Sequence, residues 1–232
     1  MSTTSLLTGL GLVPLAFSLV FAVFVVVDRH FGMLTAMIAG AGLGTTCGAA
    51  WFGIECLIDH SPEKQLMPQS TTPLETRIEQ LLTEARVIIP GAQALFGFQI
   101  LVMLTNGFDR LPQSSKWVHL TALLLVAVNM VLLIMPAALH RLTFGGDNSA
   151  KFLRIGSGIV VTAPAFLAAG ISAENYVVFQ KVIGHMASSI TVAVVTFSSI
   201  IVCWYAVPLA LRWLHSTKRA RRKALGAQIR ST

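Results

Sequence analysis

Several side chains that can bind or transfer a cation stand inside the long apolar runs of this 232-residue chain, or at their ends. Glu55 and Asp59 are four residues apart, as are Cys56 and His60, so each pair falls on one face of a helix. A carboxylate at the edge of the hydrocarbon is costly unless it is protonated, paired or hydrated, which makes Glu55 a candidate cation ligand. The alternative is that a helix ends here and these groups meet water among the headgroups.

Further candidates lie in the later apolar runs. Glutamine and asparagine carry strong donors and acceptors, and a histidine near a carboxylate can take up and release protons near neutral pH. We expect these groups to face the bundle interior and to line a cavity that opens to the cytosol. Alternatively, the amides only join helices, and His140 with Arg141 complements the negative end of a helix dipole. The predicted transport set is Glu55, Glu84, Arg86, Gln93, Gln99, Asn129 and His140.

The composition indicates what kind of scaffold must position these residues. The chain is 54% hydrophobic and 12% charged, and its mean hydropathy is +0.72. This apolar surface exceeds what one soluble core can bury, so most of it must face lipid. Uncharged runs of about 20 residues are long enough to cross a bilayer as helices. We predict an all-α membrane bundle of six transmembrane helices, at residues 6–27, 33–58, 87–105, 118–139, 152–172 and 186–214.

These runs divide the chain into four parts. Residues 1–60 are expected to form a two-helix transmembrane hairpin and residues 61–72 a cytosolic loop; residues 73–214 hold an amphipathic helix plus a four-helix membrane module, and residues 215–232 a basic cytosolic tail. Small residues recur every four positions in the hairpin and predict a ridge on which another helix packs closely. An unwound, substrate-binding helix is the alternative for the same pattern. The ridge includes Gly40, Gly44 and Gly48.

The stretch before the membrane module has the features of an interfacial helix. Thr72, Pro73 and Glu75 fit a capping box with proline at the first helical position. The apolar residues that follow recur at spacings of three and four, as in an amphipathic helix that lies along the bilayer surface. Pro90 lacks an N–H donor and, together with Gly91, predicts a turn from this helix into a buried span.

Charge and turn residues predict the topology. Residues 106–117 and 174–185 are expected as external loops, and residues 145–148 as a cytosolic turn. Most of the 17 lysines and arginines then lie on one side of the membrane, which predicts that both termini are cytosolic. The exceptions are Arg29, Arg110, Lys116 and Lys181.

Four motifs carry a resemblance to known sequences. They read EARVIIPGAQALFGFQ from Glu84, LLIMPAALHRLTF from Leu132, GHMASS from Gly184 and WYAVPLALR from Trp204. In this order they resemble an uncharacterised family of small bacterial inner-membrane proteins, over about residues 74–213. The resemblance implies a four-helix module that is sometimes labelled as related to sodium:proton antiporters. Two features depart from the family pattern: the two spans before Pro73 are an addition, and Leu139 replaces a residue that is often aromatic.

The chain contains no P-loop, HExxH, GxSxG, TVGYG or dinucleotide-binding motif, so we expect neither an enzyme nor a cofactor. The leading hypothesis is a multi-pass protein of the bacterial inner membrane that translocates a cation or proton. A non-transporting accessory or assembly subunit is the first alternative. The second is a haem or quinone redox subunit, with His119 and His185 near the external face.

The expected partners follow from the apolar spans and the basic tail. They are the lipid bilayer, anionic lipids at the basic tail, and either further copies of the chain or other subunits of a membrane complex. Nucleic acid is not expected as a partner, because the basic residues cluster after the last span rather than over a soluble face.

Overall fold

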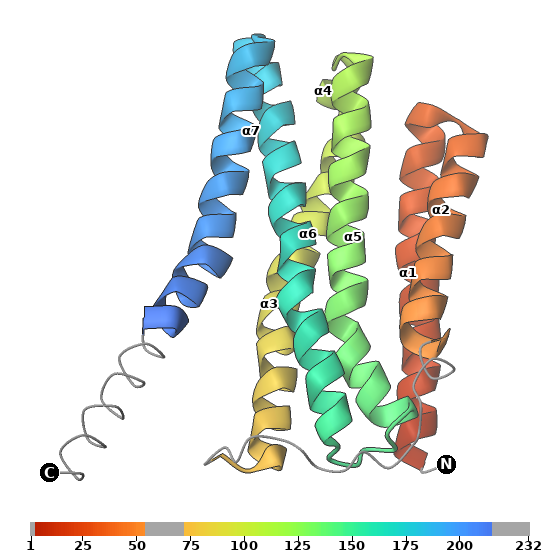
Figure 1. Ribbon diagram of the computed structural model, residues 1–232. Coiled ribbons are helices and arrows are strands. Elements are labelled where there is room, and N and C mark those ends of the chain that lie inside the picture. The colour runs from red at the N-terminus through yellow and green to blue at the C-terminus, as the bar shows by residue number, and fades with distance from the viewer. Residues whose placement is uncertain (1–2, 54–71, 215–232) are drawn as a thin grey trace, which may run out of the picture.

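The computed structural model describes residues 3–53 and 72–214, with side chains from residue 11 onward. Every long element in this part of the chain is a helix (Figure 1). After α7 the chain passes through the π-helical turn η3 and continues as a helix to Leu214. The elements are α1 (Thr3–Phe31), α2 (Met33–Gly48), the π-helical turn η1 (Ala49–Gly53), α3 (Leu74–Met103), α4 (Asn106–Asp109), α5 (Gln113–Leu142), α6 (Ala150–Ile183), α7 (Met186–Ile201) and η3 (Val202–Ala206).

Six helices of the described chain are long and apolar enough to cross a membrane. This confirms the predicted all-α fold with six spans. The spans are Gly11–Phe31, Met33–Gly53, Leu74–Met103, Gln113–Leu142, Ala150–Ile183 and Met186–Leu214. Glu55 and the rest of the predicted cation motif lie outside the described residues, as do the basic tail and nearly all of the loop at 61–72.

The helices run roughly side by side, so the bundle has two ends (Figure 1). We call one the Gly184 end; there α6 turns into α7, α1 turns into α2, and α3 is joined to α5 through α4. The opposite end, which holds Arg141, Lys151 and Arg154 where α5 turns into α6, is the basic end.

α5 is the central helix of the bundle. It packs against α6, α3 and both helices of the N-terminal hairpin, and its span is the most deeply buried of the six. Leu123, Val126, Ala127 and Val131 are fully buried along it. α7, in contrast, packs mainly on α6, and Figure 1 shows it spreading away from the other helices toward the basic end.

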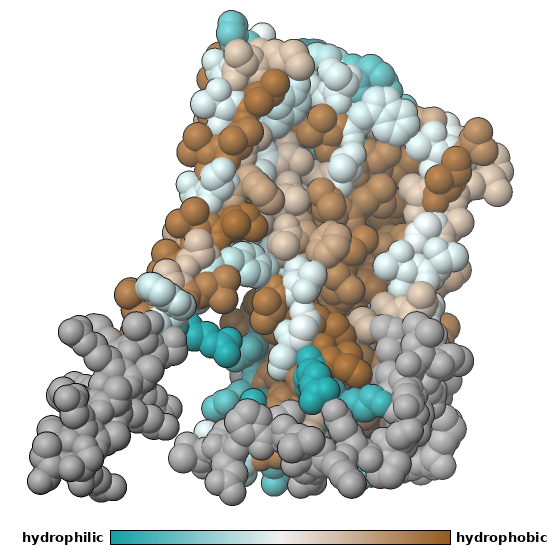
Figure 2. All heavy atoms as spheres, in the orientation of Figure 1, coloured by the Kyte–Doolittle hydropathy of each residue, from teal (hydrophilic) through white to brown (hydrophobic). Residues whose placement is uncertain are grey.

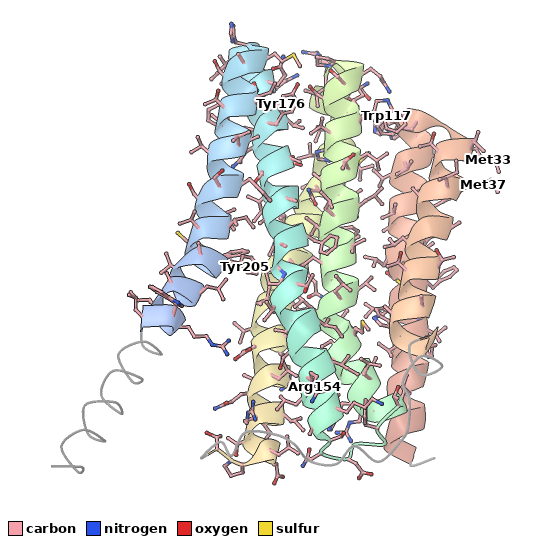
Figure 3. The ribbon with its side chains drawn as sticks, viewed as in Figure 1. Met33, Met37, Trp117, Arg154, Tyr176 and Tyr205 are labelled. Atoms are coloured by element: carbon pink, nitrogen blue, oxygen red, sulfur yellow. The ribbon has the colours of Figure 1, made fainter. Side chains whose placement is uncertain are left out.

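The N-terminal hairpin is held to α5 at two levels. The Trp51 side chain is 2% exposed, and its indole N–H donates to the carbonyl of Val131 at 3.0 Å. At the Gly184 end the ring of Phe31 lies 4.4 Å from that of Trp117, which Figure 3 shows on α5 beside the hairpin. The hairpin is therefore packed on the membrane module rather than separate from it.

The closest helix approaches occur at glycines of α6. A Cβ atom added at Gly156 would lie 2.6 Å from Leu81 of α3, and one at Gly170 would lie 2.8 Å from Val126 and 3.2 Å from the carbonyl oxygen of Ala122 on α5. The predicted ridge on α2 has looser contacts. Gly40 and Gly44 face Val20 of α1 at 3.6 Å, whereas Gly48 has open space beside it.

The predicted turn at Pro90-Gly91 is wrong, because α3 is continuous from Leu74 to Met103 with Pro90 inside it. The amphipathic segment is the first half of this helix, and its apolar residues Ile78, Leu81 and Ala85 are buried in the bundle. This face is buried because packing against neighbouring helices excludes more water from it than contact with the headgroup region would. The predicted N-cap lies one residue too early, because Pro73 rather than Thr72 is the N-cap of α3.

The predicted external loop at 174–185 is wrong as well. α6 continues to Ile183 and ends at Gly184, which takes the left-handed conformation at φ 72°. Of the predicted loop at 106–117, residues 106–109 form α4 and the stretch from Gln113 belongs to α5. The longer α6 is what brings Glu174 inside the bundle.

We predict that Gly170→Ala destabilises the protein by about 1–3 kcal/mol, because neither the Ala122 backbone nor the packed Val126 can move far enough to admit a methyl group. Gly158→Ala on the same helix is the matched control, since no atom lies within 4 Å of its added Cβ. Thermal unfolding of the two purified variants in detergent measures the difference. Equal transition temperatures would contradict the close approach of α5 and α6.

Candidate functional site

Three polar side chains from three helices meet near the Gly184 end. They are Gln99 of α3, His119 of α5 and Glu174 of α6. His119 Nδ1 lies 3.0 Å from Glu174 Oε2 and 3.1 Å from Oε1. His119 Nε2 lies 3.1 Å from the carbonyl oxygen of Gln99, and the Gln99 side-chain amide donates to Glu174 Oε2 at 3.3 Å.

The cluster is shielded from solvent to different degrees. His119 is 0% exposed and Gln99 is 1% exposed, whereas the Glu174 side chain retains 17% exposure. Gln99 stands one turn before the end of α3, His119 in the second turn of α5, and Glu174 about two turns before the end of α6. The site therefore lies a few turns inside the bundle, with the carboxylate as its most accessible member.

The hydrogen-bond partners of His119 limit where protons can be placed in the cluster. Both ring nitrogens face oxygen atoms, and a neutral imidazole has only one N–H. Two arrangements satisfy both contacts: imidazolium beside ionised Glu174, or protonated Glu174 donating to Nδ1 while Nε2–H donates to Gln99. Both arrangements have zero net charge and differ only in where one proton sits. Loss of that proton leaves one negative charge inside the bundle and one nitrogen facing an oxygen without a hydrogen between them.

A second histidine forms a parallel contact one helical turn away. His30 of α1 places Nε2 at 2.6 Å from the carbonyl oxygen of Met103, the last residue of α3. Its Nδ1 lies 3.5 Å from Asp109. Because the final carbonyls of a helix have no partner within the helix, His30 caps α3 in the same way that His119 contacts the preceding turn.

Phe108 separates the two histidines. Its ring centroid lies 4.8 Å from that of His30 and 5.1 Å from that of His119, both edge to face. The ammonium of Lys116 lies 5.8 Å from the same ring. An apolar ring thus interrupts the polar groups that run from Asp109, which is half exposed, to Glu174, which is partly buried.

The predicted transport set is not gathered in one cavity. Within the described chain, Gln99 lies at the Gly184 end, and Glu84, Arg86 and His140 lie toward the basic end. Gln93 is exposed rather than directed into the bundle. Asn129 is fully buried in the middle of α5, and neither atom of its amide has a hydrogen-bond partner.

Glu84 borders a cavity of about 790 Å³ between α3, α6 and the end of α7. Apolar side chains make up most of its wall, and Gly91, Pro164, Trp204 and Tyr205 also contribute. Figure 2 shows the surface hollowed beside the lower part of α7, with hydrophilic residues at the border of the hollow.

Arg86 borders a different pocket, of about 240 Å³, between α3 and α5. His140 and Arg141 line it together with apolar residues. Glu84 and Arg86 are two residues apart on α3, so their side chains reach opposite flanks of the helix. The acidic and basic groups of the predicted set are thereby separated into two pockets.

Residues 70–208 match a protein family described as a family of unknown function (DUF6328). The chain belongs to this family. No curated protein and no solved structure matches the chain. The match confirms the predicted uncharacterised family, while the four-helix description and the antiporter label stay predictions. The DUF6328 region contains Gln99, His119 and Glu174, whereas His30 belongs to the hairpin that precedes it.

The predicted transport set lacks Glu174 because residues 174–185 are expected as an external loop, and it lacks His119 because that residue is expected near the external face. One feature of the DUF6328 sequence does indicate the longer helix: residues 171–183 contain neither glycine nor proline, so nothing stops α6 before Gly184. The haem alternative also placed His119 near the external face with His185. His119 is instead buried with both nitrogens engaged, and His185 is exposed.

We predict that Glu174→Ala destabilises the protein by about 1–3 kcal/mol, because it leaves buried donors of His119 and Gln99 without an acceptor. Glu174→Gln keeps an acceptor oxygen at the same place and should unfold close to the wild-type temperature. Thermal unfolding in detergent compares the two. If the alanine variant is as stable as the glutamine variant, the cluster does not hold the three helices together.

Proposed function

We propose that this DUF6328 protein translocates protons across the membrane in which its six helices lie, with the His119–Glu174 pair as the proton-binding site. The observation that supports this most directly is that both ring nitrogens of His119 face oxygen atoms, those at Nδ1 belonging to the Glu174 carboxylate, so that one proton can be placed on either side chain. Ionisable residues within membrane spans are expensive and are functional by default.

A purely structural role explains less of the geometry. Interhelical hydrogen bonds between uncharged side chains hold membrane helices together at a smaller desolvation cost than an ion pair. A glutamine in place of Glu174 would join α6 to His119 without placing a carboxylate among buried groups. The carboxylate adds the capacity to bind and release a proton. We propose that this capacity is the reason for a side chain with so high a desolvation cost at this position.

Exchange with water is easiest from the Gly184 end. Glu174 retains some exposure whereas His119 has none, so the carboxylate is the member that meets protons first. Asp109 and His30 lie at the same end and offer a second pair of proton-binding groups on the far side of Phe108. With both termini cytosolic, as the charge distribution predicts, this end faces away from the cytosol.

Polar groups continue along α5 toward the basic end. Asn129 follows His119 by ten residues, or about 15 Å of helix, and His140 follows by a further eleven, or about 16 Å. Eleven residues complete close to three turns, so Asn129 and His140 share one face of α5. Asn129 thus supplies a donor and an acceptor halfway between the two histidines.

Buried apolar residues lie along α5 between these groups. Leu123 and Val126 fall between His119 and Asn129, and Leu133 and Leu139 between Asn129 and His140; each is at most 1% exposed. Passage of a proton toward the basic end therefore requires these helices to shift. We propose that protonation of the pair, which removes its negative charge, changes the relative stability of the two helix arrangements.

Flux measurements with purified protein test the proposal. In liposomes loaded with a pH-sensitive dye, a membrane potential should drive proton entry through the wild-type protein. Glu174→Gln keeps the hydrogen-bonding shape but cannot hold the proton, so its flux should fall to that of protein-free liposomes. Glu75→Gln, at an exposed carboxylate in the first turn of α3, should leave the flux unchanged.

Two results would overturn the proposal. One is a wild-type rate no higher than that of protein-free liposomes over a range of potentials and pH gradients. The other is a Glu174→Gln rate equal to that of wild type. Either would favour the alternative of an accessory subunit whose buried polar groups only join helices.

A further inference from the structure

We propose that the cavity between α3, α6 and α7 binds an organic cation with a bulky apolar body. The proposal stands apart from proton translocation, because the cavity lies toward the basic end and shares no residue with the His119–Glu174 cluster. Its volume of about 790 Å³ is within the usual range for small-molecule sites, about 300–1,000 Å³. Most of the wall is apolar, from residues such as Val87, Ile88, Val160 and Leu167.

Among the described residues, the cavity has one charged residue in its wall, and that residue is acidic. Glu84 is exposed and forms no ion pair or hydrogen bond within the part of the chain that the structure describes. Arg86, the nearest arginine along α3, lines the separate pocket on the other flank of the helix. A cation that enters the cavity therefore meets an unpaired carboxylate and no competing basic side chain of the wall.

Aromatic side chains give the cavity a second feature that favours cations. Trp204 and Tyr205 both belong to η3, where the helix widens into a π-helical turn, and such turns occur frequently at functional sites. Figure 3 shows Tyr205 reaching from the end of α7 toward α6. Its hydroxyl donates to the carbonyl of Val161 at 2.7 Å, which fixes the ring beside the cavity. Ring faces of tryptophan and tyrosine attract cations electrostatically.

The helix backbone adds a further electronegative group. Pro164 has no N–H and leaves the carbonyl of Val160 without its donor in α6. Both residues line the cavity. The polar features of the wall are thus a carboxylate, aromatic rings, the hydroxyl of Thr83 and a freed carbonyl.

This combination selects one class of ligand. An acyl chain of a lipid would fill the apolar space but leave Glu84 uncompensated, and an anionic amphiphile would be repelled by it. A small inorganic cation would balance Glu84 without using the apolar walls. A monovalent organic cation with aromatic or branched apolar groups does both.

The test uses two ions of the same shape and opposite charge, tetraphenylphosphonium and tetraphenylborate. Equilibrium dialysis against the full-length protein in detergent should show saturable binding of the phosphonium ion and none of the borate. Glu84→Gln should weaken phosphonium binding by about two- to fivefold, the loss expected for one partly exposed ion pair. Glu79→Gln, an exposed carboxylate on α3 outside the cavity, should bind as wild type does.

Binding of both ions to the same extent, no saturable binding of the phosphonium ion, or unchanged binding by Glu84→Gln would each overturn the proposal. Glu174→Gln separates this question from proton translocation. If that variant loses proton flux and still binds the phosphonium ion, the two sites act independently. If wild type shows flux but no phosphonium binding, only the cavity proposal fails.

Discussion

A bilayer offers no hydrogen bonds to a protein's polar groups, so every buried donor and acceptor must find its partner within the chain. In the Gln99, His119 and Glu174 cluster, three helices supply partners for one another's polar groups, and of the cluster's buried side-chain atoms the Gln99 amide oxygen is left without one. The cluster therefore constrains the depth and rotation of α3, α5 and α6 together. The close approaches of α6 at Gly156 and Gly170 place the backbones near enough for these short contacts to form.

The N-terminal hairpin extends the same principle. His30 binds the last carbonyl of α3 one turn beyond the carbonyl that His119 contacts, and Phe108 fills the space between the rings. The hairpin precedes the region that matches the family, yet it supplies the cap for the helix that carries Gln99. The N-terminal hairpin is thus a structural part of the site. Its His30 lies beside Asp109 of α4, which is half exposed at the surface of the bundle.

The sequence predicts the class and the spans of this protein better than its site. Apolar runs identify six membrane helices because the bilayer imposes one length on all of them. Local rules misplace two boundaries. Pro90 predicts a turn but lies inside α3, since neighbouring helices cover the apolar face of the helical segment that precedes it. Glu174 is predicted in a loop because a carboxylate is rare in a membrane span. Its place within a span is explained by its partner His119, which lies 55 residues away in the sequence.

The predicted polar residues also show what periodicity leaves open. Gln93 and Gln99 stand on the same helix and are equally polar, yet Gln93 is exposed and Gln99 buried. Which side of α3 faces α5 is decided by tertiary packing, and the spacing of single polar residues does not contain that information. Glu84 and Arg86 are separated in the same way, into pockets of opposite character.

Glu174 and His119 are proposed to bind and release one proton together inside the bundle. Infrared difference spectroscopy of the reconstituted protein between acid and alkaline pH measures this directly. We expect a carboxyl signal that changes with pH, shifts in D₂O and is absent from Glu174→Gln. A pH difference spectrum identical in wild type and Glu174→Gln would contradict it.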